Sequence, residues 1–148
     1  MTSAEWFRQE LWRSAGAETL QDWLHPPLGK AGHESWDPED LLVLARMWQA
    51  GDVGSLKDHG DYRKALEEIT ARVLVMPSKT DQYFPPEDGE NEAKYLKNGT
   101  FDPIPTIWGH IGGGGANPDD VKWMDEKIST FLAEGEMVKP PMHKAFGK

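Results

Sequence analysis

Residues 72–118 read RVLVMPSKTDQYFPPEDGENEAKYLKNGTFDPIPTIWGHIGGGGANP, and this stretch decides the fold. Residues 73–76 are apolar, have strand length and are followed by Pro77, which is typical of a strand covered on both faces in a parallel sheet. A second strand is expected within residues 100–107, where two prolines restrict it to a short or edge strand. Because a helix starting at two prolines, residues 85–86, separates the strands, the pattern predicts an α/β fold.

One acid and one histidine follow these two strands. Asp81 lies in the loop after the first expected strand, and His110 lies directly after the second. Sites in open α/β sheets lie at the carboxyl ends of the strands, so this order predicts that the carboxylate and the imidazole share one edge. Taken singly, Asp81 could bond amides of its own turn and His110 could be a structural histidine. The order strand, acid, helix, strand, histidine favours a shared site.

The sequence around both residues is similar to the homoserine O-acetyltransferase-like family of α/β-hydrolases. The likeness rests on VLVMPSKTDQYFPPED, IPTIWGH and GGGGANP, with DLLVLARMWQAGDVG upstream, and covers about residues 6–132. It implies a partial α/β-hydrolase fold with a helical lid segment, the last two strands and the last helix, the nucleophile half being absent. It also implies a Ser-His-Asp triad in which His110 takes the serine proton and Asp81 orients the imidazole.

The nucleophile of such a triad is missing from the chain. An α/β-hydrolase serine sits in G-x-S-x-G, and no serine here has glycine on both sides at that spacing. Ser78 is near Asp81 but follows a proline on the same loop, which argues against it as a substitute. We therefore expect the chain alone to be inactive, whereas the family transfers acyl groups from a thioester or ester to a hydroxyl or water.

The resemblance also bears on the substrate. Acyl-CoA is a candidate co-substrate, and no cofactor is expected. Family members place an aspartate after the histidine to hold the amino-acid substrate, and this chain has Ile111 there. An ester or thioester hydrolase of the same branch therefore fits as well as homoserine acetylation.

Other candidate site residues lie on the same loops. Tyr83 and Phe84 could line an acyl pocket or equally pack beneath the Asp81 loop. The glycine run 112–115 could crowd amides around an anion, but GxxxxGK[ST] is missing, so a flexible turn before a helix capped by Asn117 is favoured. Histidines occur singly, without metal-ligand spacing, so no metal site is expected.

Helix signals dominate the chain before the first expected strand. The capping-box spacing of Thr2 and Glu5 predicts a helix over about residues 4–14. Asp37 followed by proline predicts another helix start. One apolar face then recurs at helical spacing in Leu41, Leu44, Ala45 and Trp48.

Shorter helices are expected from residue 19 and over residues 62–69, the second leading into the first strand. The chain then divides into a helical lid-like segment at 1–60 and the C-terminal part of a hydrolase core at 61–134. Residues 135–148 contain two prolines and no periodicity, which predicts a mobile tail.

Charge limits the partners. The net charge of −9 and pI near 5.0 disfavour nucleic acid and anionic membranes. No window approaches the ~18 apolar residues of a membrane span, and the stretch MTSAEWFRQELW is too charged for a signal peptide, so a cytoplasmic location is expected.

The expected partners are a small-molecule acyl substrate or the missing N-terminal half, with self-association as a further option. An alternative function is a non-catalytic binding or interaction module that keeps the acid–histidine pair as scaffold and exposes strand edges for a partner. An incomplete gene product is a third interpretation.

Overall fold

The computed structural model describes residues 2–25, 36–56 and 60–136. The elements, in chain order, are α1 Ala4–Arg8, α2 Leu20–Leu24, α4 Pro38–Ala50, the 3-10 helix η1 Val53–Leu56, α5 Tyr62–Glu67, β1 Val73–Val75, α6 Pro86–Ala93, β2 Gly99–Phe101, the 3-10 helix η2 Gly109–Gly114 and α7 Pro118–Glu136. The predicted tail lies outside the described residues from 137 onward, and α7 continues to Glu136.

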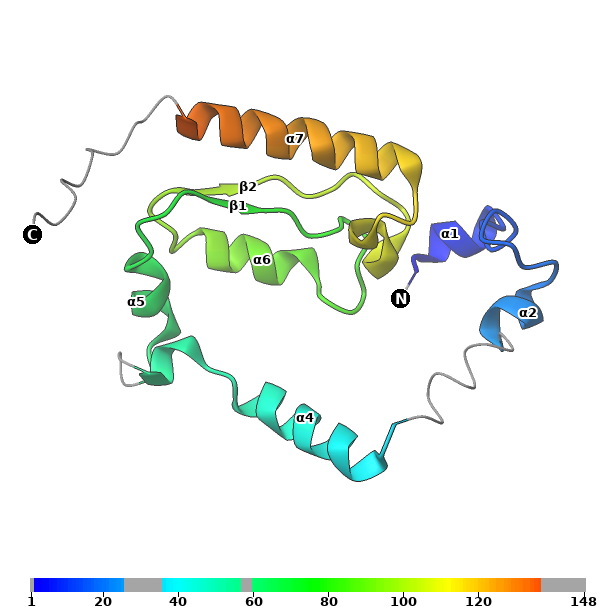
Figure 1. Ribbon diagram of the computed structural model, residues 1–148, viewed down its shortest axis with the longest axis horizontal. Helices are drawn as coiled ribbons and strands as arrows, with labels where there is room; N and C mark the ends of the chain where they lie inside the picture. Colours follow the sequence, from blue (N-terminus) through cyan, green and yellow to red (C-terminus); the bar gives the residue numbers. More distant parts are fainter. Residues whose placement is uncertain (1, 26–35, 57–59, 137–148) are drawn as a thin grey trace, which may run out of the picture.

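A parallel pair of strands forms the centre of the molecule. β1 pairs with β2 over three residues each, and an isolated bridge from Ser78 to Ile104 extends the pairing toward the strands' carboxyl ends. Figure 1 shows α7 along one face of this pair and α6 along the other. The predicted strand–helix–strand order is confirmed. β1 is only half-buried, because no other described strand pairs with its second edge.

The N-terminal segment packs on the loop that precedes His110. The expected helix over 4–14 is too long: α1 ends at Arg8, and Glu10 has a left-handed backbone with φ of 52°. Its N-cap is Ser3, which accepts a hydrogen bond from the Trp6 amide and donates one to the Ile107 carbonyl.

Trp6 is the most buried large side chain of the described residues, with 0% exposure. Its ring centroid lies 5.8 Å from that of Trp108 and 4.9 Å from that of Trp23. These aromatic contacts, rather than the helix signals, fix how the N-terminal segment folds. Part of the segment predicted to be lid-like therefore belongs to the packing beneath the His110 loop.

Helix α4 begins where the sequence predicts, because Asp37 Oδ1 accepts a hydrogen bond from the Glu39 amide at 2.7 Å. Its apolar face, however, is exposed throughout the described chain, and Trp48 is 61% exposed. In Figure 1 the helix lies beyond α6 and away from the strands. The regular apolar face was correctly predicted, and its residues are exposed; among the described residues, Tyr83 and Phe84 make ring contacts with its Trp48.

Helix α7 is tied to the sheet by polar contacts. At its start the buried Asp120 carboxylate accepts a hydrogen bond from the Thr106 hydroxyl. Further along, Lys127 Nζ lies 2.7 Å from Asp102 Oδ2, just beyond β2. Near its end, Arg72 donates to the Phe131 carbonyl at 2.8 Å.

Among the described helices, none has both the length and the apolar character needed to cross a bilayer.

The glycine run forms most of a 3-10 helix, where only a flexible turn was expected. Residues of η2 make 3-10 turns, and Gly115, with φ of 80°, ends them. Gly112 is buried so tightly that an added Cβ would lie 2.6 Å from Thr106 Cγ2. Gly114, in the same 3-10 helix, has nothing within 4 Å of such a Cβ. Close packing therefore requires glycine at one position and not at the other.

Gly112→Ala should destabilise the chain by about 1–3 kcal/mol, because the new methyl group overpacks against Thr106. Gly114→Ala is the matched control and should change stability by less than about 0.5 kcal/mol. Urea unfolding followed by tryptophan emission measures both. Equal midpoints for the two variants would contradict the close packing of η2.

Candidate active site

The structure brings Asp81 and His110 together at the carboxyl ends of the two strands. His110 Nδ1 lies 2.9 Å from Asp81 Oδ2, within hydrogen-bond distance. Asp81 is 6% exposed, and one third of the His110 side chain, 33%, is exposed. The pair therefore has the arrangement expected of an acid that orients a histidine, with the acid buried and the ring reachable.

Asp81 also organises its own turn. Its Oδ1 accepts hydrogen bonds from the amides of Tyr83 at 2.7 Å and Phe84 at 3.0 Å, while Oδ2 contacts His110. The two interpretations of this aspartate, as turn residue and as histidine partner, thus apply together, one to each oxygen.

Hydrogen bonding keeps Asp81 ionised. Burial raises the pKa of the Asp81 carboxyl, but hydrogen bonds from His110 and from the amides of Phe84 and Tyr83 outweigh that effect. The net result is a pKa below the ordinary value for aspartate. A carboxylate that is charged at neutral pH can stabilise a positive charge on the imidazole.

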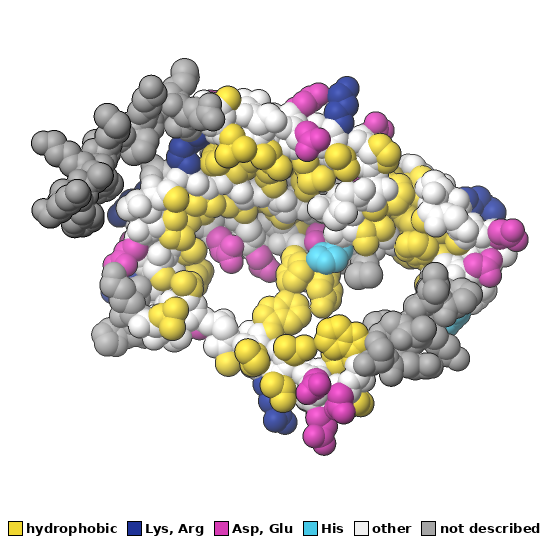
Figure 2. Space-filling view, viewed as in Figure 1, with side chains coloured by type: hydrophobic (Ala, Val, Ile, Leu, Met, Phe, Trp, Pro, Cys, Tyr) yellow, Lys and Arg dark blue, Asp and Glu magenta, His cyan; other side chains and the backbone are white. Residues whose placement is uncertain are grey.

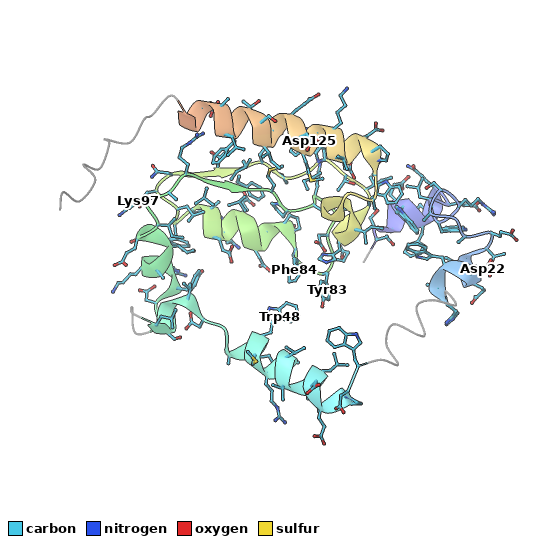
Figure 3. All side chains as sticks on the ribbon, in the orientation of Figure 1. Asp22, Trp48, Tyr83, Phe84, Lys97 and Asp125 are labelled. Atoms are coloured by element: carbon cyan, nitrogen blue, oxygen red, sulfur yellow. The ribbon has the colours of Figure 1, made fainter. Side chains whose placement is uncertain are left out.

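Two aromatic side chains, Tyr83 and Phe84, lie beside the histidine, and Figure 3 shows them on the side of the molecule that faces Trp48. Their ring centroids lie 5.0 and 5.2 Å from the His110 ring. Trp48 reaches toward them from α4, with its centroid 5.7 Å from Phe84 and 6.2 Å from Tyr83. In Figure 2 hydrophobic side chains bridge the space between α4 and the rest of the molecule beside a histidine. The aromatic residues therefore form one side of the site.

A hollow of about 530 Å³ opens beside the pair. Its lining includes both Asp81 and His110 and the predicted Phe84, but not Tyr83. The remaining lining residues are Met76, Pro77, Ser78, Ile111, Gly113, Gly114 and Ala116. The volume suits a small organic ligand.

Neither a nucleophile nor a metal site is assembled here by the described residues. No hydroxyl of a described serine makes a hydrogen bond to His110, and Ser78 is buried in the lining of the hollow. In the described ranges no three histidine, aspartate or glutamate side chains gather as metal ligands would. The site thus offers an acid and a base.

Sequence reasoning missed Thr80 and Thr106, which connect the two loops through their hydroxyls. The Thr80 hydroxyl bonds to the Thr106 carbonyl and the Gly109 amide, and the Thr106 hydroxyl bonds to the Trp108 amide. The available signal was weak: a threonine beside the acid and another just before the histidine loop.

Comparison with known proteins adds a functional class. The chain matches no model of a known protein family. It is 34% identical over 131 residues to the ethyl acetate hydrolase of Pseudomonas veronii and 33% identical over 134 residues to a probable esterase of Corynebacterium glutamicum. The homologues are esterases. Each match covers 88% of this chain but only 37% of the relative, so the chain spans little more than a third of these proteins.

Two solved structures of acetyl esterases are also similar to this chain. The acetyl esterase MekB matches 89% of this chain and 38% of its own, with a TM-score of 0.79 and 33% identity. An acetylester hydrolase from Corynebacterium glutamicum matches 86% of this chain and 36% of its own, with a TM-score of 0.76 and 31% identity. The α/β fold is therefore shared with acetyl esterases, and the narrower likeness to homoserine O-acetyltransferases stays a prediction.

His110→Ala should raise the pKa of Asp81, because it removes a hydrogen bond to the carboxylate. Carbon-13 NMR of the aspartate carboxyls measures the pKa, with His25→Ala as a control away from the site. In the native chain Asp81 should titrate below the ordinary value of about 3.9. Equal pKa values in native chain and His110→Ala would contradict the assigned bond.

The same depressed pKa predicts how stability depends on pH. Ionised Asp81 contributes stability above its unfolded pKa of about 3.9, and this contribution is lost as pH falls through the lower folded pKa. The difference in unfolding free energy between the native chain and Asp81→Asn should therefore shrink as the pH falls below about 3.9 and through the folded pKa of Asp81. Urea unfolding at several pH values measures it, and a difference that grows in acid would contradict the sign.

Proposed function

We propose that Asp81 and His110 are the acid and base of a Ser-His-Asp site that hydrolyses short acetyl esters. The observation that carries the proposal is the contact between His110 Nδ1 and the ionised Asp81. With Nδ1 engaged, Nε2 is the ring nitrogen that remains for proton transfer. The exposed part of the ring and the adjoining hollow give a substrate access to it.

The chemistry follows from the roles of the two side chains. His110 takes the proton of a serine hydroxyl as that oxygen attacks the ester carbonyl, and then gives it to the departing alcohol. Water, deprotonated by His110, next releases the acid from the serine. Asp81 fixes the tautomer of the ring and stabilises the imidazolium at each step.

The serine and the oxyanion-binding amides are assigned to sequence outside these 148 residues. The support is the absence of G-x-S-x-G from the chain and the greater length of its relatives. An acid and a base without nucleophile or oxyanion donors lack the groups that supply most acyl-transfer catalysis. The chain is thus the C-terminal part of an α/β-hydrolase and is inactive alone.

Water is the proposed acyl acceptor. The relatives are named for the hydrolysis of ethyl acetate and acetyl esters, and Ile111 stands where the homoserine branch has a substrate-binding aspartate. Transfer from acyl-CoA to a hydroxyl is the narrower alternative, and it uses the same acid and base.

A second candidate function is a non-catalytic interaction module. Specific observations favour it: β1 has an edge without a described neighbour, and the apolar residues of α4 are exposed. These same surfaces fit a partner that carries the missing half of a hydrolase. The two functions differ only in whether His110 takes part in chemistry.

The purified chain should hydrolyse p-nitrophenyl acetate no faster than buffer and should not react with a serine-directed fluorophosphonate probe. Addition of the part of the Pseudomonas veronii enzyme that lies outside the matched region should restore esterase activity. With His110→Ala the restored activity should fall by more than about 10⁴-fold. His25→Ala, in the C-cap of α2, is the matched control and should restore activity like the native chain.

The outcomes separate the alternatives. Binding of the two parts without activity would favour the interaction module. Stoichiometric labelling of the chain alone by the fluorophosphonate would overturn the assignment of the nucleophile to sequence outside the chain.

A further inference from the structure

Thr80 joins the loop of Asp81 to the loop of His110. Its Oγ1 lies 3.0 Å from the Thr106 carbonyl oxygen, to which it donates, and 3.1 Å from the Gly109 amide nitrogen, from which it accepts. Both contacts are partly buried. One hydroxyl therefore bonds to both ends of the turn of residues 106–109, which leads into His110. It donates its proton to one end and accepts a proton at the other.

The two loops are joined at successive residues. Thr80 bonds to Gly109 and Asp81 bonds to His110, each across 29 positions of sequence. The first contact reaches the backbone and the second the imidazole. Gly109 has φ of 61°, a conformation that few other residues adopt. The Thr80 hydroxyl bonds to the amide of this residue, one position before His110.

Thr106 extends the connection to α7. Its hydroxyl donates to the buried Asp120 carboxylate and accepts from the Trp108 amide at 3.0 Å. The direction of each bond is fixed, because a carboxylate only accepts and an amide only donates. The amides of Trp108 and Gly109 thus each donate to a threonine hydroxyl. Each of these hydroxyls donates its own proton to another acceptor, the Asp120 carboxylate or the Thr106 carbonyl.

We propose that Thr80 is a positioning residue, which sets the His110 backbone so that Nδ1 meets Asp81. It acts through Gly109 and is not among the residues that line the hollow. The effect on the His110–Asp81 bond follows from the geometry of this chain alone, and only the effect on turnover rests on the proposed function. A serine can make both bonds of Thr80, whereas the isosteric valine can make neither.

Nitrogen-15 histidine NMR of the full chain tests the proposal directly. Thr80→Ser should keep the His110 ring resonances and the Nδ1 proton signal of the native chain. Thr80→Val should shift the ring resonances and lose that proton signal by exchange with water, while circular dichroism shows the helices intact. Unchanged His110 signals in a folded Thr80→Val chain would overturn the proposal.

A measurement on the native chain guards against loss of folding in Thr80→Val. The Gly109 amide of the native chain should be protected from exchange with deuterium, because it donates to the Thr80 hydroxyl, and Thr80→Ser should preserve that protection. An unprotected Gly109 amide in the native chain would overturn the proposal without any valine variant.

Turnover in the reconstituted esterase gives the functional readout. Thr80→Val should lower kcat by about 10²-fold with KM nearly unchanged, because a displaced base affects the chemical step more than binding. Thr80→Ser should restore kcat to within a few-fold of the native value. A Thr80→Val kcat equal to the native one would overturn the positioning role. Failure of reconstitution with the native chain would count against the proposed function, and the NMR result would still decide the role of Thr80.

Discussion

Parallel pairing of β1 with β2 is the constraint on which the site depends. In a parallel pair both strands end at the same edge, so the loops that follow them must lie side by side. α6 makes the crossover that parallel strands require, and the Ser78–Ile104 bridge carries the alignment up to the loops. An antiparallel pair would have placed Asp81 and His110 at opposite ends of the sheet. The parallel direction of the strands thus brings the acid and the histidine together.

A pair of three-residue strands is a weak frame by itself. The loops compensate with side-chain bonds to backbone: Asp81 closes its own turn, and the threonines bond to the amides before His110. Trp6 then packs against Trp108 from the N-terminal side. Geometry at the histidine is thus held by several polar contacts and by aromatic contacts from Tyr83, Phe84 and Trp6, rather than by an extended sheet.

Much of this could be predicted from the sequence, because the signals are local. The strand of residues 73–76, the Asp37 cap and the order of acid and histidine each depend on neighbouring residues. The predictions that failed did so because of contacts between residues that are not neighbours in sequence. α1 stops early where Trp6 packs against distant rings, and the glycine run is ordered because Gly112 fits against Thr106. The threonine contacts span loops, and no periodicity marks them.

Contacts within the chain also explain how an acid–histidine pair can form although the chain lacks G-x-S-x-G. The hydrogen bonds that join the Asp81 loop to the His110 loop come from residues 80–110, and Trp6 and Asp120 of the same chain support the second loop. Among the described residues, the exposed surfaces lie on other features, the α4 face and the unpaired edge of β1. Covering those surfaces would bury apolar area and stabilise the assembly, but the pair does not require it. Under the proposed function, a complementing part would contribute the serine and the oxyanion donors. The aromatic contact between Trp48 and Phe84 is where the exposed face of α4 meets the site, so this face and the residues around His110 lie next to each other.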